Sequence, residues 1–141
     1  MIVILDTNVV VSGILKPGGP AGSILRLAVQ GAIRLAHDPR ILIEYREVLS
    51  RPAFGFPKDQ VCALIGHFEK EGLGTIGLPL PFRLPDPDDE PFLEVAMASR
   101  ADVLITGNKR NFAGNKHKMK VLSPAEFIAE FRLRTNLGDP G

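Results

Sequence analysis

Three acidic residues from separate parts of the chain have the types and positions that could hold a metal ion. Asp6 directly follows a short apolar run at residues 2–5, Glu44 lies in an amphipathic segment, and Asp89 lies in an acidic run before another apolar segment. Acids gathered from distant segments repel one another, and a divalent cation offsets that repulsion. An oxygen-only ligand set suits Mg²⁺ or Mn²⁺. The scattered histidines and the single cysteine form no zinc motif.

Asp6 and Glu44 also have purely structural explanations. An aspartate after a strand can serve as a turn or helix-cap residue. Over residues 39–51 a helical projection places Glu44 at the border of the apolar face and Glu47 nearly opposite to it. Glu47 is therefore expected in solvent. Glu44 can face the edge of the core, where an unpaired carboxylate is costly. A metal ion, an ion pair with Arg51 or a reach to water would each remove that cost.

The acidic run at residues 85–91, Pro-Asp-Pro-Asp-Asp-Glu-Pro, admits the same two interpretations. Acidic residues before a helix stabilise its N-terminus through capping and the helix dipole. The apolar residues that follow define an inward face, and Asp89 projects to that side whereas Glu90 projects away. Asp88 is either the cap residue or a further ligand. The sequence therefore leaves both roles open for this run.

The elements that must position these acids alternate between strands and helices. Such alternation predicts crossover connections, a parallel sheet and helices on both faces. Ligands bind such folds beyond the carboxyl ends of the strands, which is where Asp6 and Thr106 are expected. Residues 16–22 are expected to form a loop. The expected strands are residues 1–5, 33–36, 75–80, 103–106 and 121–122, and the expected helices are 23–30, 39–51, 58–71, 88–100 and 123–132.

The composition is that of one globular domain. The chain has 141 residues, of which 45% are hydrophobic and 23% charged, and its net charge is +1. Polyanion binding would therefore depend on local clusters of cations. The lone Cys62 cannot form an internal disulfide and is expected to be a small core residue. No apolar run approaches the length of a membrane span, so the sequence predicts a soluble, cytoplasmic protein without membrane contact.

Four segments in the same order resemble the PIN domain. They are VILDTNVVVSGIL near the start, DPRILIEYREVLSRP, LPDPDDEPFLEVAMASRADVLITGN and KVLSPAEFI near the end. More narrowly, they resemble stand-alone prokaryotic PIN proteins that act as the toxins of toxin–antitoxin pairs. The resemblance implies an α/β fold, a PIN-like three-layer sandwich with a mostly parallel sheet of about four to five strands. The domain is expected at residues 1–132 and a flexible tail at residues 133–141.

The resemblance also implies a function. PIN proteins of this kind hold Mg²⁺ or Mn²⁺ on an acidic cluster and cut single-stranded RNA by activated water. By position, Asp6, Glu44 and Asp89 match the catalytic and metal-binding acids. Asn8 and Thr106 match polar residues that support the first acid and the floor of the site. An antitoxin protein and a second copy of the chain, in a homodimer, are the partners that the resemblance implies.

One position departs from the family pattern. Many relatives carry a fourth acid where this chain has Asn108. An asparagine can coordinate a metal through its carbonyl oxygen, but it adds no charge. A second metal site would then depend on Asp88, or one metal would suffice. The alternative function is a PIN-fold module that binds RNA or a partner protein without cutting.

A basic stretch follows Asn108, with five Lys or Arg residues in the twelve positions 109–120. A solvated loop is the plain explanation, yet its place beside the expected site favours phosphate contacts. Phe112 is either a base contact or a core anchor. The expected phosphate-binding residues are Lys109, Arg110, Lys116 and Lys118.

Two other classes of α/β protein also place an aspartate after the first strand. A phosphatase that forms an aspartyl-phosphate requires a second aspartate two residues after the first, where this chain has Asn8. A receiver domain requires a pair of acidic residues before the position of Asp6, and this chain has no such pair. Both alternatives are therefore weaker than the nuclease.

Overall fold

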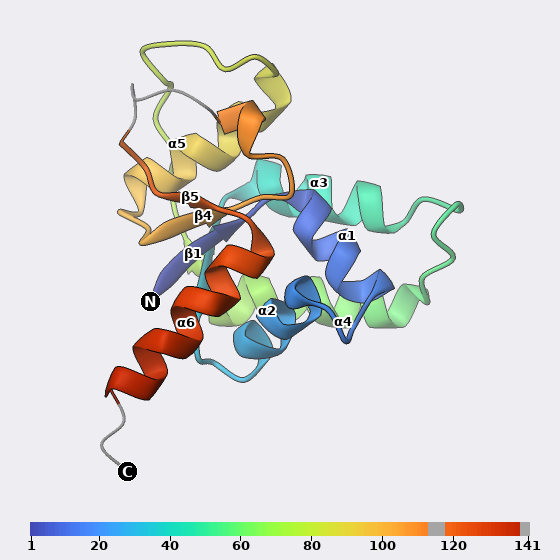
Figure 1. Ribbon diagram of the computed structural model, residues 1–141. Coiled ribbons are helices and arrows are strands. Elements are labelled where there is room, and N and C mark those ends of the chain that lie inside the picture. Colours follow the sequence, from blue (N-terminus) through green and yellow to red (C-terminus); the bar gives the residue numbers. More distant parts are fainter. Residues whose placement is uncertain (113–117, 139–141) are drawn as a thin grey trace.

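A five-stranded parallel sheet forms the centre of the computed structural model, which describes residues 1–112 and 118–138 (Figure 1). The strand order is β3-β2-β1-β4-β5, and every pair of neighbours is parallel. The expected α/β fold class with a parallel sheet is thereby confirmed. The strands are β1 (Ile2–Leu5), β2 (Arg34–His37), β3 (Leu73–Gly74), β4 (Val103–Ile105) and β5 (Val121–Leu122).

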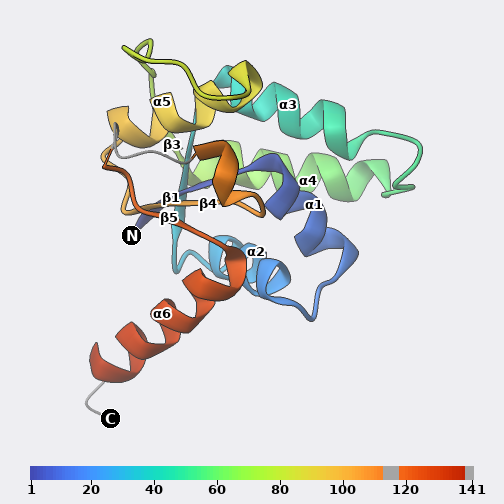
Figure 2. The same cartoon turned by 45° about the horizontal axis from the view of Figure 1, so that its top comes forward.

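Helices cover both faces of this sheet, as expected. Figure 2 shows α3 and α5 on one side of the strands and α2 and α6 on the other. A short 3₁₀ turn, η1 (Pro87–Asp89), precedes α5, and another, η2 (Lys109–Phe112), follows β4. The helices are α1 (Thr7–Leu15), α2 (Pro20–Val29), α3 (Pro39–Leu49), α4 (Lys58–Glu71), α5 (Glu90–Ala98) and α6 (Pro124–Gly138).

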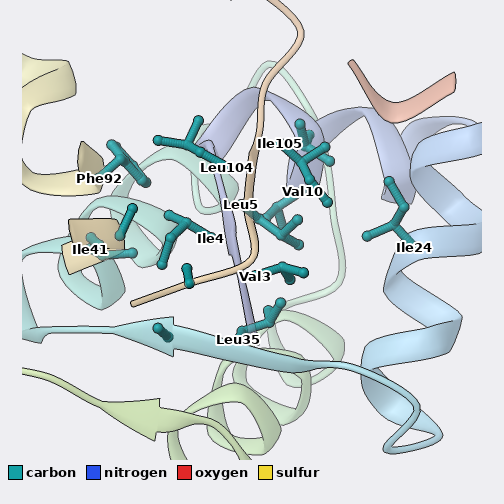
Figure 3. Close-up of a cluster of buried hydrophobic side chains, with 14 of the residues drawn as sticks. Val3, Ile4, Leu5, Val10, Ile24, Leu35, Ile41, Phe92, Leu104 and Ile105 are labelled. Carbon is teal, nitrogen blue, oxygen red and sulfur yellow. The ribbon is translucent and has the colours of Figure 1, made fainter. Parts of the chain in front are cut away.

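The central strand β1 is buried on both faces because its side chains alternate between two apolar layers. Val3 and Leu5 point to the side of Ile24 on α2, whereas Ile4 points to the side of Phe92 on α5 (Figure 3). All five side chains are at most 1% exposed. A strand enclosed in this way is a rigid support for whatever follows its last residue.

The chain changes direction across the sheet between β1 and β4. After β1 the connections run outward to β2 and then β3, and after β4 they run the other way to β5. In open parallel sheets, such a switch point leaves a crevice at the carboxyl ends of the strands. The backbone N–H of Asp6 donates to the carbonyl of Ile105 at 2.9 Å, which ties the two strand ends together.

One expected strand is wrong. Residues 75–80 form no strand, and the pairing with β2 is made two residues earlier, at Leu73–Gly74. The segment contains Gly77 and Pro79, and both residue types weaken a strand. Only the N–H of Thr75 continues the ladder, to the carbonyl of His37 at 2.8 Å.

The helix α1 is an element that the sequence analysis did not assign. Its valines are β-branched and favour strands over helices, so no local signal separates α1 from β1. Packing against α2 supplies the stability that the low helix propensity of these valines does not provide. A Cβ at Gly13 would lie 2.5 Å from the Leu25 side chain, and one at Gly22 would lie 2.2 Å from the Pro17 carbonyl. These glycines allow the close approach of α1, the following loop and α2.

Three further details differ from expectation. The helix α2 begins at Pro20, which shortens the predicted loop at residues 16–22, and α6 continues to Gly138 instead of ending near Arg132. Cys62 is exposed and not a core residue. Among the helices of residues 1–112 and 118–138, none has the length and apolar character of a membrane span.

We expect two glycine substitutions to have opposite effects on stability. Gly22→Ala should lower the free energy of unfolding by about 1–3 kcal/mol, because the new Cβ would overlap the backbone of Pro17. Gly66→Ala, in an open position on α4, should raise it by up to about 1 kcal/mol through helix propensity. Urea denaturation of both variants measures the difference. A stabilised Gly22→Ala would contradict the close packing described here.

Candidate functional site

A cleft of about 570 Å³ opens at the carboxyl end of β1, between α1, α3 and η1. We call it the acidic cleft, because five carboxylates line it. Three of them are the acids that the sequence analysis expects to bind metal, and a fourth is the further candidate Asp88, so the chain brings together residues up to 83 positions apart in sequence. The five acids are Asp6, Glu44, Asp86, Asp88 and Asp89.

Asp6 is buried at the end of β1, with 6% of its surface exposed. It precedes α1, yet its side chain makes no capping hydrogen bond to that helix. Instead its carboxylate accepts a hydrogen bond from the hydroxyl of Thr106, which is fully buried, at 2.7 Å. Burial is the largest effect on this carboxyl and raises its pKa, although the Thr106 hydrogen bond acts in the opposite direction.

Backbone hydrogen bonds orient the threonine that holds Asp6. The N–H of Asn108 donates to the Thr106 hydroxyl oxygen at 3.0 Å, which leaves the hydroxyl proton for Asp6. The side-chain oxygen of Asn8 accepts from the N–H of Gly107 at 3.1 Å. Thr106 therefore contacts Asp6 directly, and Asn8 contacts the backbone next to Thr106, while their supporting role in function stays a prediction. Asn108 acts through its backbone, and its side chain is exposed.

Glu44 enters the acidic cleft from α3. Asp38 caps the start of that helix by accepting from the N–H of Ile41 at 3.0 Å. Glu44 is half-buried and accepts a hydrogen bond from the hydroxyl of Thr7. Burial is the first cause of its raised pKa, and the charge of Asp6 adds to the rise. The exposed Glu47 lies in solvent, as the helical projection predicts.

Asp89 has an oxygen without a partner. The residue is 9% exposed, and its Oδ2 atom is buried with no hydrogen bond. Burial, followed by the charge of Asp6, raises the pKa of this carboxyl to about 6. A buried carboxylate oxygen without a hydrogen bond or a cation is costly. The atom is therefore the strongest single indication that a ligand binds here.

Two expectations about the neighbouring acids need correction. Asp88 is not a cap residue: Asp86 caps the turn η1 by accepting from the N–H of Asp88 at 2.9 Å, and Asp89 stands at the N-cap position of α5 without a side-chain capping hydrogen bond. Asp88 is exposed at the mouth of the cleft. Glu90 does not project into solvent, because it is 8% exposed and accepts from the N–H of Leu84 at 3.0 Å. The loop before η1 folds back over Glu90, which a helical projection cannot show.

Buried acids elsewhere in the described chain have cationic partners, in contrast to those of the cleft. Arg40 pairs with Asp38 at 2.6 Å and with Glu94 at 2.8 Å. Among residues 1–112 and 118–138, no ion pair involves Asp6, Glu44 or Asp89. The predicted alternative of an ion pair between Glu44 and Arg51 is therefore not seen. The side chains that support Asp6 and Glu44 are threonines, which are neutral.

The donor types of the cleft suit a hard divalent cation. Carboxylate and hydroxyl oxygens are the ligands that Mg²⁺ and Mn²⁺ prefer, and the open Asp89 oxygen would gain a partner. Within the described ranges, however, no three His, Cys, Asp or Glu side chains already converge as a metal-binding group. The charge of Asp6 adds to the raised pKa of Glu44 and of Asp89, and the charge of Glu44 also adds to that of Asp89. A cation would reverse the sign of this interaction and draw the three together.

The described residues of the basic stretch, 109–112 and 118–120, do not line the acidic cleft. Lys109 pairs with Glu126 on α6 at 2.9 Å. Arg110 and Lys118 are exposed outside the cleft, and Lys116 lies outside the described residues. Their phosphate contacts stay a prediction. Phe112 is 1% exposed and is a core residue.

Four residues that line the cleft were missed or not singled out from the sequence. Thr7 supports Glu44, and Asp86 adds a carboxylate. Lys16 and Phe54 place a cation and an aromatic ring at the same cleft. The Asp-Thr pair after β1 could have suggested Thr7. The other three are brought to the cleft by loops, and no local pattern marks them.

Fold and cleft together define a small α/β domain with carboxylates at the ends of its central strands. The model of the PIN domain family matches residues 2–110 of the sequence. The chain therefore belongs to the PIN domain family. It is also 30% identical to the uncharacterized protein MJ1680 of Methanocaldococcus jannaschii, over 92% of this chain and 90% of that protein.

Two solved structures have a similar fold. One is VapBC2 from Rickettsia felis bound to a DNA fragment from their promoter, with a TM-score of 0.57 and 18% identity over 87% of this chain and 98% of that chain. The other is FitAB bound to the IR36 DNA fragment, with a TM-score of 0.59 and 14% identity over 86% of this chain and 94% of that chain. At these identities the likeness shows the fold alone.

The raised pKa of Asp89 predicts a pH-dependent loss of stability without metal. A carboxyl whose pKa is about 6 in the folded chain, above the usual 3.8, holds its proton more tightly when folded. Its stabilising contribution is complete below pH 3.8 and is lost as the pH rises through about 6. Asp89→Asn should remove this loss and unfold at higher temperature than wild type at pH 7 in EDTA.

The matched control is Asp88→Asn, which removes a neighbouring but exposed charge. We expect a smaller change from it. Thermal melts of the three proteins between pH 4 and 8 measure the difference. Equal pH profiles for wild type and Asp89→Asn would contradict the environment assigned to this carboxyl.

Proposed function

We propose that this chain is a divalent-metal-dependent endoribonuclease that cuts single-stranded RNA. PIN domains are generally nucleases, and this chain belongs to that family. The observation that carries the proposal is the buried, unpartnered oxygen of Asp89 in a cleft that it shares with Asp6 and Glu44. Such an arrangement is unfavourable without a cation and is ready to accept one.

Asp6 is proposed as the central ligand, Asp89 as a second direct ligand, and Glu44 as a direct or water-mediated ligand. A bound Mg²⁺ or Mn²⁺ would supply charge relief at a phosphate and would lower the pKa of water. Thr106 keeps the Asp6 carboxylate in one orientation, and Thr7 does the same for Glu44. Glu44, with its raised pKa, is positioned to orient a water molecule at the cleft.

The missing fourth acid bears on the number of metals. Asn108 supports Thr106 through its backbone, and its side chain does not line the cleft. An asparagine in place of an acid at position 108 therefore leaves the three acids Asp6, Glu44 and Asp89 in the cleft. We propose that one metal suffices, with the exposed Asp88 as a candidate ligand for a second.

The cellular role proposed here is that of the toxin of a toxin–antitoxin pair, with an antitoxin protein as its partner and a homodimer as its assembly. This part rests on the resemblance of the sequence to stand-alone prokaryotic PIN toxins. The fold shared with chains of the VapBC2 and FitAB structures supports it. Expression of the wild-type chain should then arrest growth, and the Asp6→Asn chain should not.

We predict manganese-dependent cleavage of single-stranded RNA that depends on the acids of the cleft. Asp6→Asn and Glu44→Gln should each lower the rate by at least about 100-fold, because even the outer partners of metal ligands contribute 10–100-fold. Glu47→Gln, an exposed change on the same helix, should leave the rate unchanged. Cleavage of a labelled oligonucleotide with Mn²⁺ and with EDTA measures these rates.

The same experiment separates the nuclease from the alternative, a module that binds RNA without cutting. If wild type and Asp6→Asn bind RNA equally and neither cleaves it with Mn²⁺, the module is correct. Equal cleavage by Glu44→Gln and Glu47→Gln would remove Glu44 from the site.

A further inference from the structure

Two aromatic rings form a stacked pair beside the acidic cleft. The rings of Phe54 and Phe56 lie nearly parallel, at 6° between planes and 5.2 Å between centroids. Phe56 is half-buried and packs against the hydrophobic core. Phe54 is also half-buried, and it lines the cleft that holds Asp6, Glu44 and Asp89. The hydrophobic core therefore supports the ring of Phe56, and the ring of Phe56 supports that of Phe54 at the cleft.

Backbone geometry builds this pair from residues that are close in sequence. After α3 the N–H of Phe54 donates to the carbonyl of Arg51 at 3.1 Å. The N–H of Gly55 donates to the carbonyl of Pro52 at 3.2 Å. Gly55 then adopts a φ of +63°, a left-handed conformation that favours glycine. The chain reverses there, and Phe56 comes to lie against Phe54.

Other residues that line the cleft are apolar as well. Val11 and Leu15 from α1 and Val48 from α3 line it together with Phe54. Leu15 is 53% exposed, so apolar surface remains open to an occupant. The lining of the cleft thus combines carboxylates with this apolar, aromatic group of residues, which we call the apolar wall, and Lys16 is also among the lining residues.

A nucleotide has two parts that suit such a lining, an anionic phosphate for Lys16 or a bound cation and a flat, apolar base face for Phe54. We propose that Phe54 stacks on a nucleobase of the RNA strand next to the phosphate that is cut, and that Phe56 is the positioning residue behind it. This inference rests on the proposed function. A base is favoured over an apolar peptide side chain, because Lys16 and a cation on the carboxylates would suit the attached phosphate. Stacking of this kind requires an unpaired strand and tolerates any base.

The chain contains no tryptophan, so Phe54→Trp places a single fluorescent reporter at this wall. The test uses this variant with Asp6→Asn, which prevents cleavage, and a single-stranded RNA oligonucleotide as the probe. We expect the RNA to quench the tryptophan emission, and an oligonucleotide of equal length with abasic sites to quench it much less. The matched control is Phe131→Trp, half-buried on α6 and away from the cleft, whose emission should not change.

Kinetics give a second, independent test. Phe54→Ala and Phe54→Leu should each raise KM for RNA on the order of tenfold, whereas Phe54→Tyr, which keeps the ring, should stay close to wild type. Placing an abasic site next to the cut should abolish the difference between wild type and Phe54→Ala. A rise in KM for the abasic RNA as well would indicate that the substitution disturbs the cleft in general and would overturn the inference.

Failure of the inference and failure of the proposed function are distinguishable. If RNA binds and is cut, but the tryptophan emission of the Phe54→Trp variant is unchanged or Phe54→Ala keeps the wild-type KM, the stacking role is wrong and the nuclease stands. The wall would then take a protein side chain or no ligand. If wild type neither binds nor cuts RNA with Mn²⁺, both proposals are overturned.

Discussion

The repulsion between Asp6, Glu44 and Asp89 is the constraint on which the organisation of this molecule depends. Each of the three has a raised pKa, with burial as its first cause, and the charge of Asp6 adds to the rise in the other two. A lysine or arginine could offset the cost of a buried carboxylate, and Arg40 does so for Glu94 in this chain. In the acidic cleft the chain uses two threonine hydroxyls and leaves one oxygen of Asp89 open.

The sheet makes this unfavourable arrangement possible. The strand β1 is enclosed by apolar layers on both faces, and burial of this kind supplies the stability that the gathered charges reduce. Its neighbour β4 delivers Thr106 to the side of Asp6, while crossover helices bring Glu44 and Asp89 to the same end of the sheet. Cost and function are thus linked, because the charges that lower stability are the ones that would bind a cation.

Much of this arrangement could be predicted from the sequence, and the exceptions have physical reasons. The strands β1, β4 and β5 and the helix α4 are strong local patterns, and the three acids lie in one cleft as the positions after strands and on helix faces imply. The helix α1 escaped detection because tertiary packing overrides the strand preference of its valines. The roles of Glu90, Lys16 and Phe54 depend on loops that fold back on the domain, and a helical projection does not describe loops.

The most direct measurement is the location of Mn²⁺ in a crystal, by its anomalous scattering. The account predicts an ion within the acidic cleft, coordinated by carboxylate oxygens of Asp6 and Asp89, with Glu44 bound to it directly or through one water molecule. An ion located only elsewhere, or a cleft without one at a manganese concentration that supports RNA cleavage, would contradict the claim that a cation balances these three acids.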